Sequence, residues 1–128
     1  MKFDWKEYFK LAKELAETSE EAKLRSAVSR AYYSAFCLAR NYLRDIKHDP
    51  TLSRNKTDIN VHKHVADEFI HHKPKSQIMI EIGNDLNRLR PRRNKADYEE
   101  PISYSPKEAI TALMLAENII SALRKLTE

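Results

Sequence analysis

The sequence predicts an all-α protein, a single domain over residues 1–128 that folds as an up-and-down bundle of four to five helices. Only one residue is glycine and five are proline, so residues that interrupt helices are scarce. The stretch 22–46 contains neither of them, and it carries an apolar stripe at alternating steps of four and three: Leu24, Val28, Ala31, Ala35, Leu38 and Tyr42. Phe36 and Leu43 widen this stripe. We therefore expect a central helix over about 20–46 that several other helices cover.

A first helix is predicted to run from Asp4, whose side chain can cap it, to about Thr18. Glu7 stands three residues after Asp4, at the capping-box position. The buried face of this helix consists of apolar and aromatic residues: Trp5, Tyr8, Phe9, Ala12 and Leu15. The long second helix then begins at Thr18 or Ser19.

Residues 47–60 show no helical period and contain many turn-forming residues, so we expect a long surface loop there. Asn60 can cap a short third helix over about 61–72. Val65 and Phe69 then face the core.

Ser76 can open a fourth helix. Its apolar stripe consists of Met79, Ile82, Leu86 and Leu89, and the same face continues to Arg93 and Ala96. Gly83 lies inside this helix, where glycine costs about 1 kcal/mol relative to alanine. We expect a neighbouring helix to approach closely there. Pro91 removes a backbone donor, so it is predicted to kink or restart the helix.

A fifth helix begins with a strong signal in which Ser105 is the N-cap, Pro106 the first helical residue and Glu108 the capping-box glutamate. It ends near Leu126. Its inward face consists of Ala109, Leu113, Ala116, Ile120 and Leu123.

Composition limits the classes of function. The single cysteine, Cys37, excludes a disulfide framework and is predicted to be a small buried side chain. The N-terminus lacks the apolar run of a signal peptide, and no segment is long and apolar enough to span a bilayer, so we expect a cytoplasmic protein without membrane contact. The net charge of +4 is too small to indicate nucleic-acid binding by itself.

The distribution of charge is more informative. Five cations fall within eight residues that contain no acid: Arg88, Arg90, Arg92, Arg93 and Lys95. Arg93 and Asp97 are four residues apart on the extension of the apolar stripe, so both point toward the bundle. We expect Arg30 to meet Asp97 between the second and fourth helices, leaving Arg92 or Arg93 to contact a phosphate. Two interpretations stay open: a polar network that fixes helix register, or a site that binds phosphate or RNA.

Two motifs together resemble the HEPN superfamily. The first is Ser-Arg-Ala-Tyr-Tyr-Ser-Ala-Phe at residues 29–36, and the second is Arg-Asn-Lys-Ala-Asp-Tyr at residues 93–98. The chain is similar to the small prokaryotic HEPN proteins with an RAYY-x-x-F helix and a late R-x-x-A-D-Y element. His-Lys-His-Val at 62–65, with Phe69, resembles their short middle helix.

The resemblance implies a HEPN-like helical bundle that forms a homodimer. Many members are metal-independent ribonucleases that pair an arginine with a histidine four to six residues later. Many are encoded beside a minimal nucleotidyltransferase in toxin–antitoxin or defence pairs, and some partners adenylylate a tyrosine next to the motif. The binding residues that the resemblance indicates here are Arg30, Tyr33, Arg92, Arg93, Asn94, Asp97 and Tyr98, with Tyr98 as the candidate for modification.

The sequence departs from the ribonuclease pattern, because Asp97 and Tyr98 stand where the histidine is required. An aspartate beside arginines stays ionised and is a poor general acid. The leading interpretation is therefore a module that binds RNA, a nucleotide or a nucleotidyltransferase partner, with a degenerate ribonuclease motif. The alternatives are a ribonuclease toxin that uses Arg93, Asp97 and His64, or a structural helical adaptor.

The remaining polar clusters suggest no cofactor. His62, His64, His71 and His72 match no tight zinc spacing, even with Asp67 and Glu68 nearby, so we expect surface or packing roles and no metal. An alternative is that His62 or His64 joins the Arg93 region in space. Four tyrosines are expected to pack in the core with satisfied hydroxyl groups: Tyr32, Tyr33, Tyr98 and Tyr104.

Overall fold

The computed structural model describes residues 2–52, 60–100 and 104–128. It contains the helices α1 (Lys6–Leu15), α2 (Glu21–Asp45), α3 (Val61–Ile70), α4 (Gln77–Tyr98) and α5 (Pro106–Thr127). No strand occurs in these described residues. The prediction of an all-α helical bundle is confirmed.

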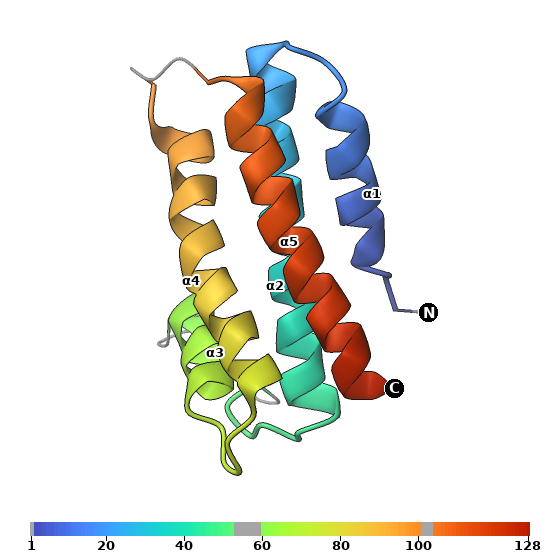
Figure 1. Ribbon diagram of the computed structural model, residues 1–128, viewed down its shortest axis with the longest axis vertical. Coiled ribbons are helices and arrows are strands. Elements are labelled where there is room, and N and C mark those ends of the chain that lie inside the picture. Colours follow the sequence, from blue (N-terminus) through green and yellow to red (C-terminus); the bar gives the residue numbers. More distant parts are fainter. Residues whose placement is uncertain (1, 53–59, 101–103) are drawn as a thin grey trace.

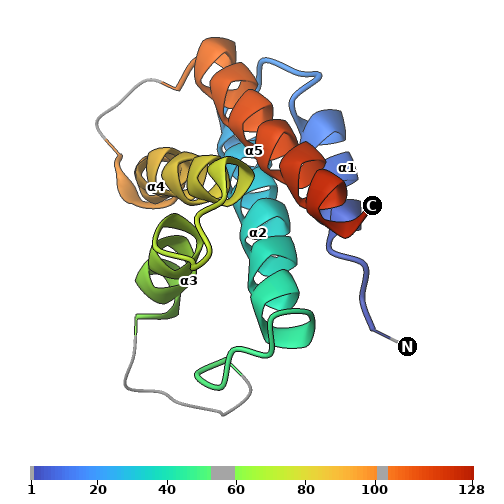
Figure 2. The same cartoon turned by 60° about the horizontal axis from the view of Figure 1, so that its bottom comes forward.

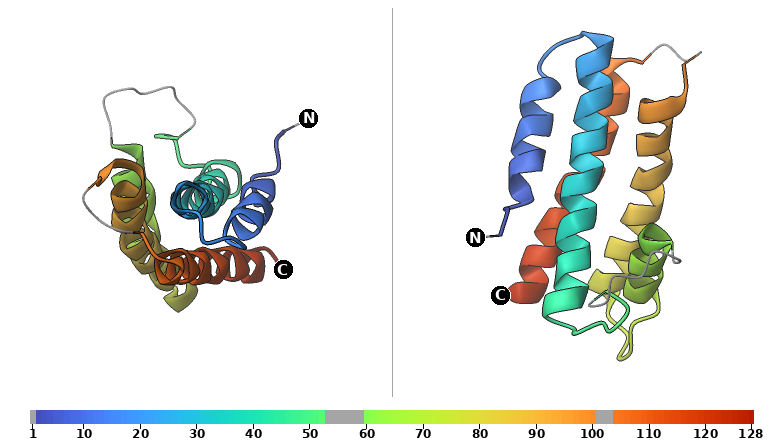
Figure 3. Two further views of the ribbon diagram at one scale, coloured as in Figure 1. Left: turned by 90° about the horizontal axis from the view of Figure 1, so that it is seen from above. Right: turned by 180° about the vertical axis from the view of Figure 1, so that it is seen from behind.

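Helices α1, α2, α4 and α5 run alternately up and down, and the short α3 lies beside the first half of α4 (Figure 1). The long helix α2 is central, because it contacts each of the other four helices. The view from below shows α1, α5, α4 and α3 arranged around it (Figure 2). From behind, α2 lies between α1 and α4 and in front of α5 (Figure 3). The long apolar stripe in the sequence therefore belongs to the helix at the centre of the bundle.

Burial extends around α2 beyond the predicted stripe. Ser34 is fully buried, and its hydroxyl donates a hydrogen bond to the Trp5 carbonyl oxygen at 2.7 Å. Cys37 is buried, as predicted, and burial raises the pKa of its thiol. Four alanines of this helix are also fully buried where other helices pack on it: Ala27, Ala31, Ala35 and Ala39.

The predicted caps of α3 and α4 are confirmed, whereas the N-cap of α1 is Trp5 and not Asp4, and that of α2 is Glu20 and not Thr18 or Ser19. The Asn60 side chain accepts a hydrogen bond from the Lys63 amide at 3.2 Å, and that of Ser76 accepts one from the Met79 amide at 3.3 Å. These two side chains satisfy donors that the first turns of α3 and α4 leave unpaired. Helix α1 is shorter than predicted and ends at Leu15.

The start of α5 differs from the predicted capping box. Ser105 is the N-cap and Pro106 the first helical residue, but the Ser105 side chain makes no capping hydrogen bond. The Glu108 carboxylate accepts a hydrogen bond from Arg92 of α4 at 3.2 Å. A tertiary contact with α4 therefore replaces the local one.

Helix α4 continues through Pro91, so the predicted restart does not occur. The close helix contact at Gly83 is confirmed. A Cβ atom there would lie 2.5 Å from Ile70 Cγ1 and 2.7 Å from the Ala66 carbonyl oxygen, both on α3. The glycine allows α3 to pack directly on the backbone of α4.

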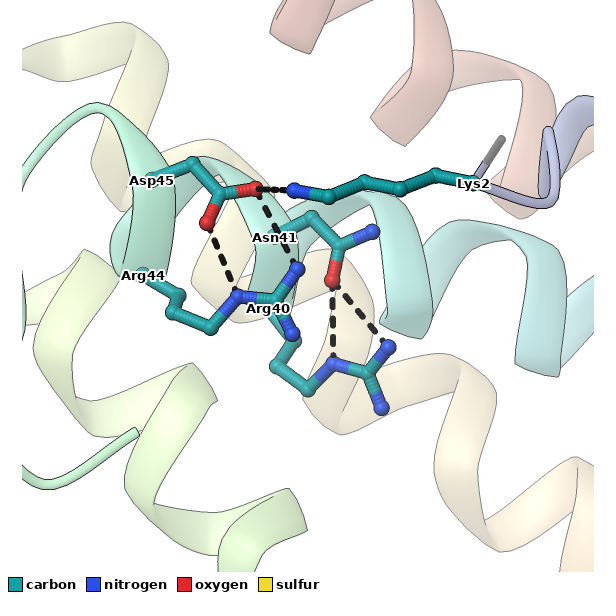
Figure 4. Close-up of polar contacts among 5 residues, drawn as sticks. All are labelled: Lys2, Arg40, Asn41, Arg44 and Asp45. Carbon is teal, nitrogen blue, oxygen red and sulfur yellow. Dashed lines mark hydrogen bonds and ion pairs between the residues drawn. The ribbon is translucent and has the colours of Figure 1, made fainter. Parts of the chain in front are cut away.

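The C-terminal end of α2 carries a polar cluster (Figure 4). Asp45 pairs with Arg44 at 2.9 Å and with Lys2 at 3.5 Å, and the hydrogen bond from Arg44 lowers the pKa of Asp45 to about 2. The predicted loop over 47–60 follows, and its residues 53–59 lie outside the described part of the chain. None of the described helices is both long and apolar enough to cross a membrane.

Candidate functional site

The predicted motif on α4 meets the central helix at Arg93. This residue is only 7% exposed, and its guanidinium carbon lies 5.2 Å from the ring centre of Tyr32 and 5.3 Å from that of Tyr33. Its Nη1 atom is 3.6 Å from Asp97 Oδ2. The predicted pairing one turn apart on α4 is confirmed. Either Arg92 or Arg93 was predicted to contact a phosphate. The Arg93 guanidinium lies inside the bundle, so Arg92 is the more exposed of the two.

Asp97 also connects α4 to α2. The Ser29 hydroxyl donates a hydrogen bond to Asp97 Oδ2 at 3.4 Å. On the preceding turn of α2, Arg25 donates to the Lys95 and Ala96 carbonyl oxygens at 3.3 and 2.9 Å. Carbonyl groups in the last turn of a helix lack partners within the helix, so Arg25 satisfies the C-terminal end of α4.

Arg30 does not make the predicted contact with Asp97. Its guanidinium lies 4.9 Å from the ring centre of Tyr8, on α1. One residue along an α-helix turns the side chain by about 100°, so Ser29 faces α4 and Arg30 faces α1. Arg30 and Asp97 nevertheless line the same pocket of about 350 Å³, together with Arg25, Ser26 and Ser29.

His62 lies beside the same aromatic pair. Its Nδ1 is 2.6 Å from the Tyr32 hydroxyl, and its ring stacks on that of Phe36 with 4.4 Å between centres. Burial raises the pKa of Tyr32, so the phenol is protonated and donates, and His62 Nδ1 accepts. Burial, together with the nearby charges of Arg90 and Arg93, lowers the pKa of His62 to about 4.

His64, the histidine predicted as a catalytic candidate, points elsewhere. Its Nε2 is 2.8 Å from Asp49 Oδ2, in the segment that follows α2. His62 is therefore the histidine that the fold brings into the Arg93 region. Both His62 and His64 were predicted as residues that could join the Arg93 region. The sequence does not distinguish them, because which of the two faces Arg93 depends on how α3 is rotated about its axis.

A family model for the HEPN domain matches residues 6–126. The chain belongs to the HEPN domain family. No curated protein and no solved structure matches it. The expected superfamily is thus confirmed over almost the whole chain.

Three of the five cations in the basic segment of this HEPN domain have a carboxylate partner. Arg88 pairs with Asp85 at 2.7 Å and Arg92 with Glu108 at 3.2 Å, besides the pair of Arg93 with Asp97. The basic segment itself contains no acid. Its acidic partners lie one turn before Arg88, one turn after Arg93 and on α5: Asp85, Asp97 and Glu108. Arg90 has a buried Nε without a hydrogen-bond partner in the described structure.

The other predicted binding residues of the HEPN domain differ in exposure. Tyr33 is half-buried against Arg93, and Asn94 is exposed. Tyr98 is 73% exposed at the last residue of α4. A ligand could enter the pocket between α2 and α4, which the exposed Arg30 lines. Tyr98 follows the pocket residue Asp97 in the sequence.

Proposed function

We propose that this HEPN domain is the binding member of a two-component system. It binds RNA or a nucleotide, or a minimal nucleotidyltransferase partner, and it does not cleave RNA by the arginine–histidine mechanism of its family. One observation carries the proposal: Arg93 is buried against the rings of Tyr32 and Tyr33 and paired with Asp97. In that position it supports the contact between α2 and α4, and residues 94–98 supply no imidazole that could exchange protons.

The pocket between α2 and α4 is the proposed contact surface for a phosphate. Arg30 is exposed, and its guanidinium has no carboxylate partner in the part of the chain that the structure describes. The Ser26 and Ser29 hydroxyl groups line the same pocket. Guanidinium and hydroxyl groups are common donors to phosphate oxygens, and such contacts position a nucleic acid without reading its sequence.

Tyr98 is the proposed acceptor for modification by a nucleotidyltransferase partner. It is well exposed, and it directly follows Asp97, a residue of the pocket, in the sequence. A modified hydroxyl group there would add negative charge next to the phosphate-binding surface. Modification would therefore weaken RNA binding, which fits a toxin–antitoxin or defence pair.

The first experiment incubates the purified protein with labelled single-stranded RNA in the absence of added metal. We expect binding without cleavage, and we expect Arg30→Ala to weaken binding and to reduce the salt-dependence slope by about one. Arg124→Ala removes an exposed cation at the far end of α5 and is the matched control. Equal binding by both variants would contradict the proposed surface. If the protein neither binds nor cleaves RNA, the result would favour a structural adaptor.

The second experiment tests the partner. The protein is co-expressed with a minimal nucleotidyltransferase encoded beside it, and the intact mass is measured after purification. An added nucleotidyl group that is lost in Tyr98→Phe and retained in Tyr104→Phe would support Tyr98 as the acceptor. Tyr104 is buried, so it is the appropriate control. An unchanged mass with active enzyme would contradict the modification.

A ribonuclease remains the second candidate function, because the fold places the His62 imidazole beside the Arg93 region. In this alternative His62, from α3, replaces the histidine that α4 lacks. Robust cleavage of RNA without metal, abolished by His62→Gln and retained by His64→Gln, would establish it and overturn the binding-only proposal.

A further inference from the structure

Three potential metal ligands converge where the segment after α2 meets α3. They are Asp49, His64 and Glu68, and one ligand atom from each lies within 4.8 Å of those of the other two. His64 and Glu68 are four residues apart on α3, so both side chains emerge from the same face one turn apart. Asp49 comes from a different segment, which is why spacing in the sequence did not reveal the cluster.

The Asp49 carboxylate is held in place toward this point. Its Oδ1 accepts a hydrogen bond from the Thr51 amide at 2.9 Å, and its own amide donates to the Leu43 carbonyl oxygen at 2.9 Å. The side chain of Asp49 is only 9% exposed, and its Oδ2 faces His64 Nε2. Asp49 and His64 are therefore already positioned in the absence of an ion. Glu68 is exposed, so its side chain can adjust to complete the site.

The donor set suits a cation of the zinc class. One imidazole nitrogen and two carboxylate oxygens are ligands that Zn²⁺ takes at about 2.0–2.2 Å, with water completing the coordination. Two such ligands around a tetrahedral ion lie roughly 3.4 Å apart. The present 2.8 Å between Asp49 and His64 therefore has to open by about half an ångström, and the ion replaces the hydrogen bond.

We propose that Asp49, His64 and Glu68 bind a divalent transition-metal cation that clamps the segment after α2 onto α3. The site lies apart from the pocket between α2 and α4, and it does not depend on the proposed function. His64 binds through Nε2 as the neutral ring, with its remaining proton on Nδ1.

The test titrates chelator-treated full-length protein with Zn²⁺ in competition with a chromophoric chelator, and with Co²⁺ followed by visible absorption. We expect one ion per chain with a dissociation constant in roughly the micromolar range or below, and a higher melting temperature with Zn²⁺. Glu68→Gln removes an exposed ligand and leaves the Asp49–His64 pair intact, so the variant folds and its affinity falls about tenfold or more. Asp49→Asn is expected to lower the affinity as well.

The control is the double variant His71→Gln/His72→Gln, which removes two histidines at the end of α3 without touching the cluster. It is expected to bind Zn²⁺ like the native chain. Absence of stoichiometric binding would overturn the proposal. So would binding that survives unchanged in Glu68→Gln and Asp49→Asn, or binding that is lost in the double histidine variant. In each of those cases Asp49 and His64 form a hydrogen-bonded pair only.

Discussion

Arg93 shows how a charged residue can be a packing element. Its guanidinium lies against Tyr32 and Tyr33, and Asp97 supplies the compensating charge. A planar guanidinium stacks on aromatic rings and buries its aliphatic stem, whereas a lysine ammonium is more strongly hydrated. Arginine is therefore required here for reasons of shape as well as charge.

The first prediction concerns this stacking. Arg93→Ala should lower the free energy of unfolding by about 2–4 kcal/mol, because it leaves a cavity and an uncompensated Asp97. Arg93→Lys should recover only part of the loss. Urea unfolding followed by circular dichroism measures both. Arg88→Ala, on the exposed side of α4, should change stability by less than about 0.5 kcal/mol. Native stability in Arg93→Ala would show that Arg93 is not a structural residue.

The second prediction concerns the hydrogen bond between Tyr32 and His62. Tyr32→Phe keeps the ring and removes the donor, so the half-buried His62 Nδ1 loses its partner at a cost of about 1–3 kcal/mol. Thermal and urea unfolding report the change. Tyr8→Phe keeps a ring under Arg30 and should be nearly neutral. Equal stability of the two variants would contradict the inferred hydrogen bond.

At the scale of elements, the packing of α3 on α4 depends on the absence of one side chain. Gly83 brings the Ala66 carbonyl oxygen and Ile70 of α3 into the space that a Cβ atom would occupy. Helix propensity and packing therefore oppose each other at this position. The observed distances are short enough that packing should dominate.

The third prediction follows from that opposition. Gly83→Ala should destabilise the protein by about 1–3 kcal/mol, although alanine is favoured by about 1 kcal/mol in an isolated helix. Asn87→Ala, at an exposed position of the same helix, should be neutral or slightly stabilising. Urea unfolding of the two variants separates the effects. A stabilising Gly83→Ala would mean that α3 can move away from α4 at little cost.

At the scale of the whole molecule, α2 organises the bundle because every other helix packs on it. The candidate site lies along one side of this helix, where α4 supplies Arg93 and Asp97 and α3 supplies His62. Changes in the site are therefore expected to alter the stability of the whole bundle. Binding studies on variants need a stability measurement beside them.

The fourth prediction concerns assembly, where the family resemblance implies a homodimer. Light scattering coupled to gel filtration should give twice the chain mass of 15.0 kDa at high micromolar concentration. The basic segment Arg88–Lys95 is expected near the interface, so hydrogen exchange in this segment should slow as the protein concentration rises. A monomer over the whole concentration range would contradict the expectation.

The sequence alone determined the features that depend on short separations. The apolar stripe of α2, the capping by Asn60 and Ser76 and the spacing of Arg93 and Asp97 all follow from the helical period. The close contact at Gly83 was also predicted, because a glycine inside a helix suggests a packing reason. The two motifs in their order were enough to suggest the family.

Only the tertiary structure decided which distant side chains meet. It turned Arg30 toward Tyr8, brought His62 rather than His64 to Tyr32, paired Arg92 with Glu108 and joined Asp49 to His64. Each residue turns a helical side chain by about 100°, so these contacts depend on how every helix is rotated about its own axis. That rotation is set by the packing of all the helices together, which no single segment of the sequence specifies.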